Sequence, residues 1–143
     1  MKNILIIGCG LLGSSLLRRI HKKKIANKIF IYEKSSSNVS KIKRLKLPGI
    51  IIKDLDQAVK KSDLIILSTP MSEYKNLILK MNKSLSNKNI ITDIGSSKIE
   101  TSKIIKSFLK RVLLGLKDIR LQVQKSVVLK MVNKIYLKTS GAF

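Results

Sequence analysis

Short apolar runs of strand length alternate with stretches of helical spacing along most of this chain. The runs are almost entirely apolar, as in Leu64–Leu67 (LIIL), which is typical of parallel strands buried on both faces. Between them, apolar side chains recur every three or four residues, which predicts helices with one buried face. The pattern predicts strand-type runs at 4–7, 29–33, 50–52, 64–67 and 90–93, and helices from residue 11 into lysines 22–24 and at 38–47, 55–59, 74–81 and 99–109.

Polar residues at the boundaries of these elements agree with this division of the chain. Asp54 and Ser72 stand where a side-chain oxygen would cap the helix that follows. Strand and helix alternate five times, so the expected fold class is α/β. We expect a doubly wound, mostly parallel sheet with helices on both faces and a ligand at the carboxyl ends of the strands.

A glycine motif follows the first strand directly. Gly8, Gly10 and Gly13 form Gly-x-Gly-x-x-Gly, which opens into the first helix, and this looks like the phosphate-binding turn of a dinucleotide-binding βαβ unit. Gly8 permits the tight turn, Gly10 leaves room for backbone amides to approach a pyrophosphate, and Gly13 lets the helix pack close to the strand. The predicted cofactor-binding residues of this turn are Gly8, Cys9, Gly10, Leu11, Leu12 and Gly13.

An acidic residue ends the second predicted strand. Glu33 lies twenty residues beyond Gly13, where a carboxylate can accept both hydroxyls of the adenine ribose and repel a 2′-phosphate. Glu33 therefore favours NAD over NADP, although Lys34 and Ser35–Ser37, just after it, could accept a phosphate. Together the glycine motif and this acid predict a fold of the Rossmann type.

The charge of the chain raises a second class of function. The net charge is +22 over 143 residues, a length that suits one domain, and a basic surface attracts nucleic acid. However, the lysines are spread along the whole chain, and six aromatic residues are few for stacking bases. The abundance of Lys and Ile is also what an A/T-rich coding sequence produces. Nucleic-acid binding is therefore the less favoured reading.

Single residues and the lack of long apolar runs narrow the remaining chemistry. Cys9 has no disulfide partner and His21 stands among lysines, so we expect a packing role for the first and a solvated surface position for the second. No spacing typical of metal ligands accompanies them, so no metal is predicted. No apolar run approaches the roughly 20 residues of a membrane span. We expect a cytoplasmic protein that does not associate with membranes.

Three segments taken together resemble the nucleotide-binding half of the prephenate/arogenate dehydrogenase family. They are GCGLLGSSL at 8–16, DLIILSTP at 63–70 and TDIGSSK at 92–98, and the third is the most particular of them. The resemblance extends from residue 2 to about residue 115. We therefore expect an NAD-binding domain of the Rossmann type at 1–115 and a tail outside the family at 116–143.

This resemblance implies a reaction and a set of site residues. Family members oxidise prephenate or arogenate with NAD(P), and the ring loses hydride and carbon dioxide as it becomes aromatic in tyrosine biosynthesis. Thr69 and Pro70 would line the nicotinamide-ribose side with Ser68 and Gly95 nearby, and Ser96 would reach the substrate hydroxyl. A capped connection between strand and helix is the simpler explanation of the loop at 93–98, and both can hold.

The tail departs from the family. The Gly-His-Pro motif whose histidine takes the substrate proton is absent after Leu116, and so is the helical dimerisation domain through which the family forms homodimers. If each codon is rebuilt from the last base of one codon and the first two of the next, residues 117–124 can encode Gly-His-Pro-Ile-Ala-Gly-Thr. We hypothesise that residues from about 115 onward are a frameshifted translation of a dehydrogenase gene.

These observations predict a truncated dehydrogenase that binds NAD and does not turn over prephenate or arogenate by itself. An independent NAD-binding or redox-sensing module remains the alternative from another class, and a nucleic-acid-binding protein is a third. A gene whose shifted frame encodes no Gly-His-Pro near codon 118 would contradict the frameshift.

Overall fold

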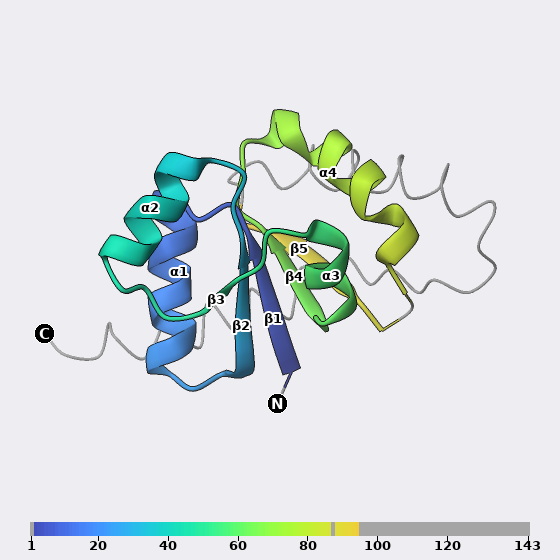
Figure 1. Cartoon of the computed structure of the whole chain (residues 1–143). Coiled ribbons are helices and arrows are strands. Elements are labelled where there is room, and N and C mark those ends of the chain that lie inside the picture. Colours follow the sequence, from blue (N-terminus) through green and yellow to red (C-terminus); the bar gives the residue numbers. More distant parts are fainter. Residues whose placement is uncertain (1, 87, 95–143) are drawn as a thin grey trace, which may run out of the picture.

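Five parallel strands form a single sheet in the computed structural model, which describes residues 2–86 and 88–94. The strand order is β3-β2-β1-β4-β5, so the chain builds outward from β1 and then crosses back to continue on its other side (Figure 1). The change of direction falls between β1 and β4, which pair in register from Ile4 with Leu64 to Ile7 with Leu67. The strands are β1 Lys2–Ile7, β2 Ala26–Tyr32, β3 Ile50–Ile51, β4 Leu64–Leu67 and β5 Ile90–Asp93.

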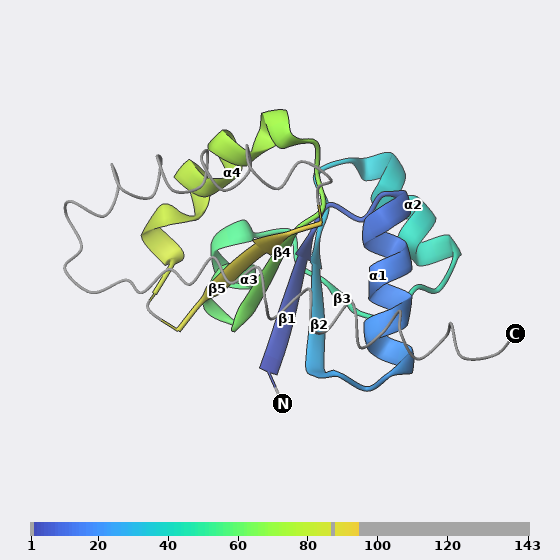
Figure 2. The same cartoon turned by 180° about the vertical axis from the view of Figure 1, so that it is seen from behind.

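Helices cover both faces of this sheet, as Figures 1 and 2 show from opposite sides. The first two helices contribute to one hydrophobic core and the next two to the other. The predicted Rossmann-type α/β fold is confirmed, and every strand pair in the described part of the chain is parallel. The helices are α1 Leu11–Lys22, α2 Ser36–Arg44, α3 Leu55–Lys60 and α4 Tyr74–Met81, with short 3-10 turns at Met71–Glu73 and Asn82–Ser84.

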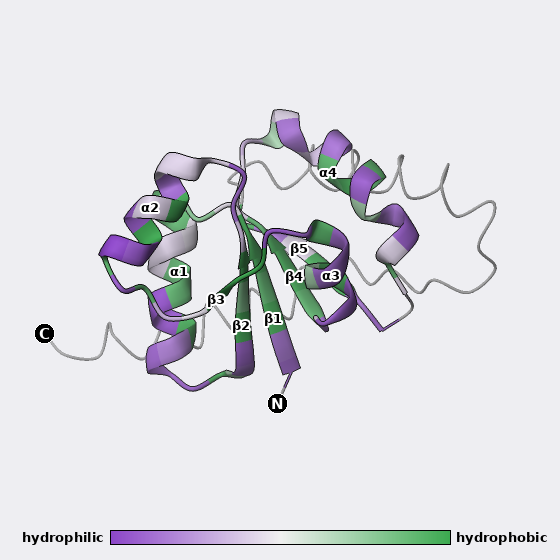
Figure 3. Cartoon of the chain, in the orientation of Figure 1, coloured by the Kyte–Doolittle hydropathy of each residue, from purple (hydrophilic) through white to green (hydrophobic). Residues whose placement is uncertain are grey.

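The apolar runs of the sequence supply both cores at once. In β1, Ile4 and Ile6 face the core beneath α1 and α2, whereas Leu5 and Ile7 face the core beneath α3 and α4. All four side chains are at most 2% exposed. Hydrophobic residues accordingly concentrate in the strands, and hydrophilic residues cover the outer helices (Figure 3). A strand between two helical layers needs apolar residues at successive positions, and this explains why the runs do not alternate with polar residues.

One of the two predicted helix caps is present and the other is wrong. Asp54 Oδ1 accepts hydrogen bonds from the backbone amides of Asp56 at 2.9 Å and Gln57 at 3.2 Å, so it caps α3 as expected. Ser72 does not cap α4, because Met71–Glu73 already forms a 3-10 turn that leads into the helix. A capping residue needs an extended backbone, and this tight turn removes that conformation before α4 begins.

Polar side chains tie together the edge of the sheet where the strands begin. The Asn3 amide donates to Asp63 Oδ2 at 2.9 Å, which joins the starts of β1 and β4. The buried Asn89 donates through Nδ2 to the Ser62 carbonyl at 2.6 Å and accepts at Oδ1 from the Ser86 amide at 2.7 Å. These bonds hold the loops at the amino ends of the strands in place.

Within the described residues, no helix is long and apolar enough to cross a membrane. The predicted helix at 99–109, the remainder of the proposed 1–115 domain and the tail at 116–143 lie outside the residues that the structure describes.

Candidate functional site

The carboxyl ends of β1, β2 and β4 bring three of the predicted site segments together. Gly8 follows β1, Glu33 follows β2 and Ser68 follows β4. Because these strands are parallel neighbours, the loops leave the same edge of the sheet on either side of the point where strand order reverses. This is where an open parallel sheet of this kind holds its ligand.

Two of the three glycines are required by close packing. Gly8 has φ of +86°, and a Cβ added there would lie 2.6 Å from Thr69 Cγ2. A Cβ at Gly13 would run into the carbonyl oxygen of Gly8 and lie 2.8 Å from Ser68 Oγ. The tight turn expected at Gly8 and the close helix packing expected at Gly13 are both confirmed.

Gly10 differs from the other two glycines. A Cβ added there would meet no atom of the described residues within 4 Å, so the space that they leave beside it is open. Gly10 is the N-cap residue of α1, provides no side-chain cap, and accepts the Ser14 amide at its carbonyl at 2.9 Å. The first-turn amides of α1 have no partners within the helix and receive no side-chain cap from Gly10, and the positive end of the helix dipole lies at this terminus. These features fit a bound pyrophosphate.

Glu33 contacts the glycine turn directly, which the sequence did not predict. Its Oε2 accepts the Cys9 amide at 2.8 Å, and its Oε1 accepts the Ser35 amide at 2.9 Å. The Gly8 amide donates to the Tyr32 carbonyl at 2.9 Å, so two hydrogen bonds join the turn to the end of β2. Each carboxylate oxygen retains a further lone pair for a ligand hydroxyl.

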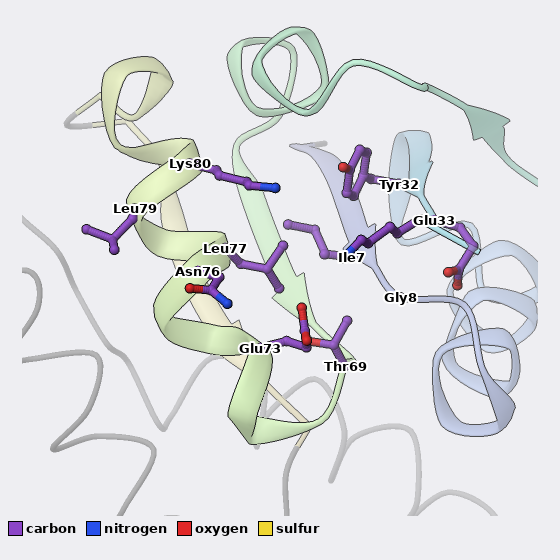
Figure 4. A pocket seen from close by; sticks show the side chains of 11 residues that line it. Ile7, Gly8, Tyr32, Glu33, Thr69, Glu73, Asn76, Leu77, Leu79 and Lys80 are labelled. Carbon is purple, nitrogen blue, oxygen red and sulfur yellow. The ribbon is translucent and has the colours of Figure 1, made fainter. Parts of the chain in front are cut away.

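A pocket of about 340 Å³ opens beside this turn, between the strand ends and α4. Figure 4 shows Leu77 and Lys80 of α4 extending toward Ile7 and Tyr32, while Thr69 closes the pocket below. The sequence did not predict that α4 lines the pocket, because the spacing of its apolar residues indicates only a helix with a buried face. The polar or charged side chains that line the pocket are Tyr32, Glu33, Lys34, Thr69, Glu73, Asn76 and Lys80.

Two buried hydroxyls after β4 lack hydrogen-bond partners in the described structure. They are Ser68 Oγ and Thr69 Oγ1, and both belong to segments that the sequence predicted at the site. A buried polar atom without a partner costs about 1–3 kcal/mol, so such atoms in a ligand site are well explained by a partner that the ligand provides. Pro70 follows them in an exposed position before the 3-10 turn.

The predicted residues of the turn differ in what their side chains do. Cys9 is 6% exposed in the core beneath α1 and α2, and burial, followed by the charge of Glu33, raises the pKa of its thiol to about 11. The thiol is therefore neutral and packs, as expected. Leu11 and Leu12 are 87% and 64% exposed, because α1 buries Gly13, Leu17 and Ile20 instead. Only the backbone of Leu11 and Leu12 lies where the turn offers its amides.

A further polar pair lies at the end of β5. Tyr74, the first residue of α4, is 1% exposed, and burial together with the neighbouring Asp93 carboxylate raises the pKa of its hydroxyl to about 12. Its hydrogen bond to Asp93 links α4 to the last residue of β5. Gly95 and Ser96, predicted for the cofactor and substrate sides, lie outside the described residues.

A known protein family matches this domain. The family described as "NADP oxidoreductase coenzyme F420-dependent" matches residues 3–97, about two thirds of the chain. The chain belongs to this family. The chain is also similar to the cyclohexadienyl dehydrogenase of Zymomonas mobilis. The two are 31% identical over 104 residues, which are 73% of this chain and 36% of that protein.

Solved dehydrogenase structures share the fold. Prephenate dehydrogenase from A. aeolicus, in complex with hydroxyphenyl propionate and NAD+, superposes with a TM-score of 0.67 at 24% identity over 76% of this chain and 38% of that one. Synechocystis arogenate dehydrogenase superposes with a TM-score of 0.64 at 23% identity, over 74% of this chain and 37% of that one. The predicted resemblance to prephenate and arogenate dehydrogenases is confirmed for this domain, and the chain spans well under half the length of these relatives.

Proposed function

We propose that this chain binds NAD at the carboxyl edge of its sheet, as the nucleotide-binding part of a dehydrogenase that acts on prephenate or arogenate. The observation that carries the proposal is the open space beside Gly10, the N-cap of α1, where no described atom lies within 4 Å of an added Cβ. The hydroxyls of Ser68 and Thr69 on the neighbouring loop, which have no hydrogen-bond partner among residues 2–86 and 88–94, support it. The A. aeolicus relative, which was solved with NAD+, supports the choice of cofactor.

The residues of the site divide the work of binding. The first turn of α1 holds the pyrophosphate through backbone amides, and Glu33 accepts hydroxyls of the adenosine ribose with its remaining lone pairs. The pocket beside Tyr32 and Lys80 receives the adenine. Thr69 also lines this pocket, and together with Ser68 it would serve the nicotinamide ribose. When bound, NAD accepts the hydride, and the protein provides placement and charge.

Cofactor choice follows from Glu33 and the residues after it. A 2′-phosphate would meet the Glu33 carboxylate at close range, which disfavours NADP. Lys34 lines the pocket and could attract such a phosphate, but Ser35 Oγ already accepts the Asn38 amide at 3.3 Å as the cap of α2. We therefore propose NAD as the preferred cofactor.

Catalysis would need a base that these residues do not include. The one histidine in the 143 residues is His21, exposed near the end of α1, whereas the site lies at the start of that helix. The family histidine is absent from the sequence, and Ser96 alone cannot take its place. We propose that this chain binds NAD without oxidising prephenate or arogenate. The frameshift hypothesis for residues beyond about 115 stands as the explanation to be tested on the gene.

The test is Gly10→Ala. The described fold has room for this methyl group, but the methyl group would occupy the space that a bound pyrophosphate needs. Titration calorimetry with NADH should show binding to the wild type and at least about a tenfold loss in the variant, with little change in melting temperature. Gly13→Ala is the contrasting variant, since its methyl group clashes with Gly8 and should lower the melting temperature itself. Unchanged NADH affinity in Gly10→Ala, or ordinary prephenate turnover by the wild type, would contradict the proposal.

A further inference from the structure

Glu33 is hydrogen-bonded to the glycine turn, in addition to its proposed contact with the ribose. Its two oxygens accept the amides of Cys9 and Ser35, so one carboxylate bridges the glycine turn and the turn that starts α2. Both donors are backbone amides of this chain. A carboxylate that served only to recognise ribose would not need both oxygens in contact with backbone amides.

The hydrogen bond to Glu33 fixes the direction of the Cys9 amide. It lies between Gly8 and Gly10, and a turn so rich in glycine has many accessible backbone conformations, so holding one of them has an entropic cost. The Gly8 amide is held by the Tyr32 carbonyl at 2.9 Å, and the Cys9 amide by Glu33 Oε2 at 2.8 Å. A charge-assisted hydrogen bond is stronger than a neutral one, so the Glu33 bond is the stronger of these two restraints.

We propose that Glu33 is a positioning residue that holds the glycine turn in its phosphate-binding shape before the cofactor arrives. This inference rests on the proposed NAD site. It assigns to Glu33 a contribution to pyrophosphate binding that is independent of the ribose hydroxyls. A turn that is already ordered loses less entropy on binding, so the contribution appears as affinity for the phosphates.

The charge of Glu33 acts in the opposite direction. A negative carboxylate close to a pyrophosphate repels it, so removing the charge by itself would tighten phosphate binding. Glu73 provides a matched control, because it lines the same pocket from the N-cap position of α4 and, among the described residues, makes no hydrogen bond to the glycine turn. Glu73→Gln removes one charge from the pocket without removing the bridge.

The experiment compares ADP with 2′,3′-dideoxy-ADP, which lacks both ribose hydroxyls, on the wild type, Glu33→Gln and Glu73→Gln. In Glu33→Gln the amide nitrogen must face one of two backbone donors, so one bridge bond is lost. We expect dideoxy-ADP affinity to fall about fivefold to tenfold in Glu33→Gln, and to stay equal or rise in Glu73→Gln. If Glu33→Gln weakens ADP while leaving dideoxy-ADP unchanged, Glu33 only recognises ribose and the inference is wrong.

A second measurement needs no ligand. Amide hydrogen exchange followed by NMR should show Cys9 and Ser35 protected in the free wild type and about tenfold faster exchange at both in Glu33→Ala, with Glu73→Gln unchanged. Unchanged exchange at Cys9 in Glu33→Ala overturns the inference by itself. If the wild type binds neither nucleotide, the proposed function fails, and the exchange experiment still decides whether Glu33 orders the turn.

Discussion

Asn89 and Thr69 are both polar residues in loops next to the sheet, yet their side chains are used in opposite ways. At the edge where the strands begin, Asn89 has its side chain bonded to the carbonyl of Ser62 and the amide of Ser86. At the edge where the strands end, Thr69 Oγ1 and Ser68 Oγ are buried without a partner in the described structure. The Asn89 side chain is satisfied within the chain, whereas we propose that the hydroxyls of Ser68 and Thr69 find their partner in another molecule.

The carboxyl edge is itself divided. On its β1–β2 side, Glu33 accepts hydrogen bonds from the Cys9 and Ser35 amides, and on its β5 side Tyr74 is hydrogen-bonded to Asp93. The unpartnered hydroxyls lie between these two ordered parts, in the loop after β4. A ligand site needs rigid surroundings and free polar groups together, and this arrangement provides both.

Asn89→Ala should have the largest effect on stability. The change leaves the buried Ser62 carbonyl and the Ser86 amide without their partner, so we expect the free energy of unfolding to fall by about 2–4 kcal/mol. Urea unfolding measures this loss. NADH affinity should stay within about twofold at a temperature where the variant is folded, because this edge does not contact the cofactor. A large loss of affinity in folded Asn89→Ala would remove the distinction between the two edges.

Tyr74→Phe should change how stability depends on pH. The Tyr74 pKa is raised from 10.0 to about 12, so between these values the unfolded chain releases a proton that the folded chain retains. The stabilisation is complete below pH 10 and is lost as the pH rises toward 12, by roughly 2–3 kcal/mol in total.

Urea unfolding midpoints of the wild type and Tyr74→Phe from pH 9 to 12 test this prediction. Lysines also titrate in this range, but they do so in both proteins, so the difference between the two curves reports Tyr74. At neutral pH the variant should lose about 1 kcal/mol with its hydrogen bond, and its stability should then decline less steeply than that of the wild type above pH 10. Parallel curves for the two proteins would contradict the raised Tyr74 pKa.

Thr69→Val should have the smallest effect on stability and the most informative effect on binding. Valine keeps the shape and removes a hydroxyl that has no partner in the described part of the chain, so the free energy of unfolding should change by no more than about 0.5 kcal/mol or should rise. If the hydroxyl serves the cofactor, NADH affinity should fall about threefold to tenfold in calorimetry. Clear destabilisation with unchanged affinity would show instead that the hydroxyl serves the fold.

The sequence predicted local features well because neighbouring residues encode them. Some features depend only on residues a few positions away in the sequence. They are the strand at Leu64–Leu67, the start of α1 at Leu11 and the Asp54 cap. The glycine motif was equally local, and its packing reasons at Gly8 and Gly13 are confirmed. Ser72 failed as a cap because the 3-10 turn before α4 leaves no clear pattern in the sequence.

Partners across the sheet were beyond local reasoning. The sequence placed Glu33 at the ribose, but the parallel pairing of β1 with β2 brought it to Cys9, 24 residues away. The same convergence placed Lys80 and Asn76 of α4 in the pocket and left the Thr69 hydroxyl without a partner among the described residues. The sequence by itself determined which segments are strands, helices and glycine turn, because backbone preference and apolar spacing act over a few residues. Only the tertiary structure decided which polar groups bond to one another and which stay free, because that depends on where the parallel strands end together.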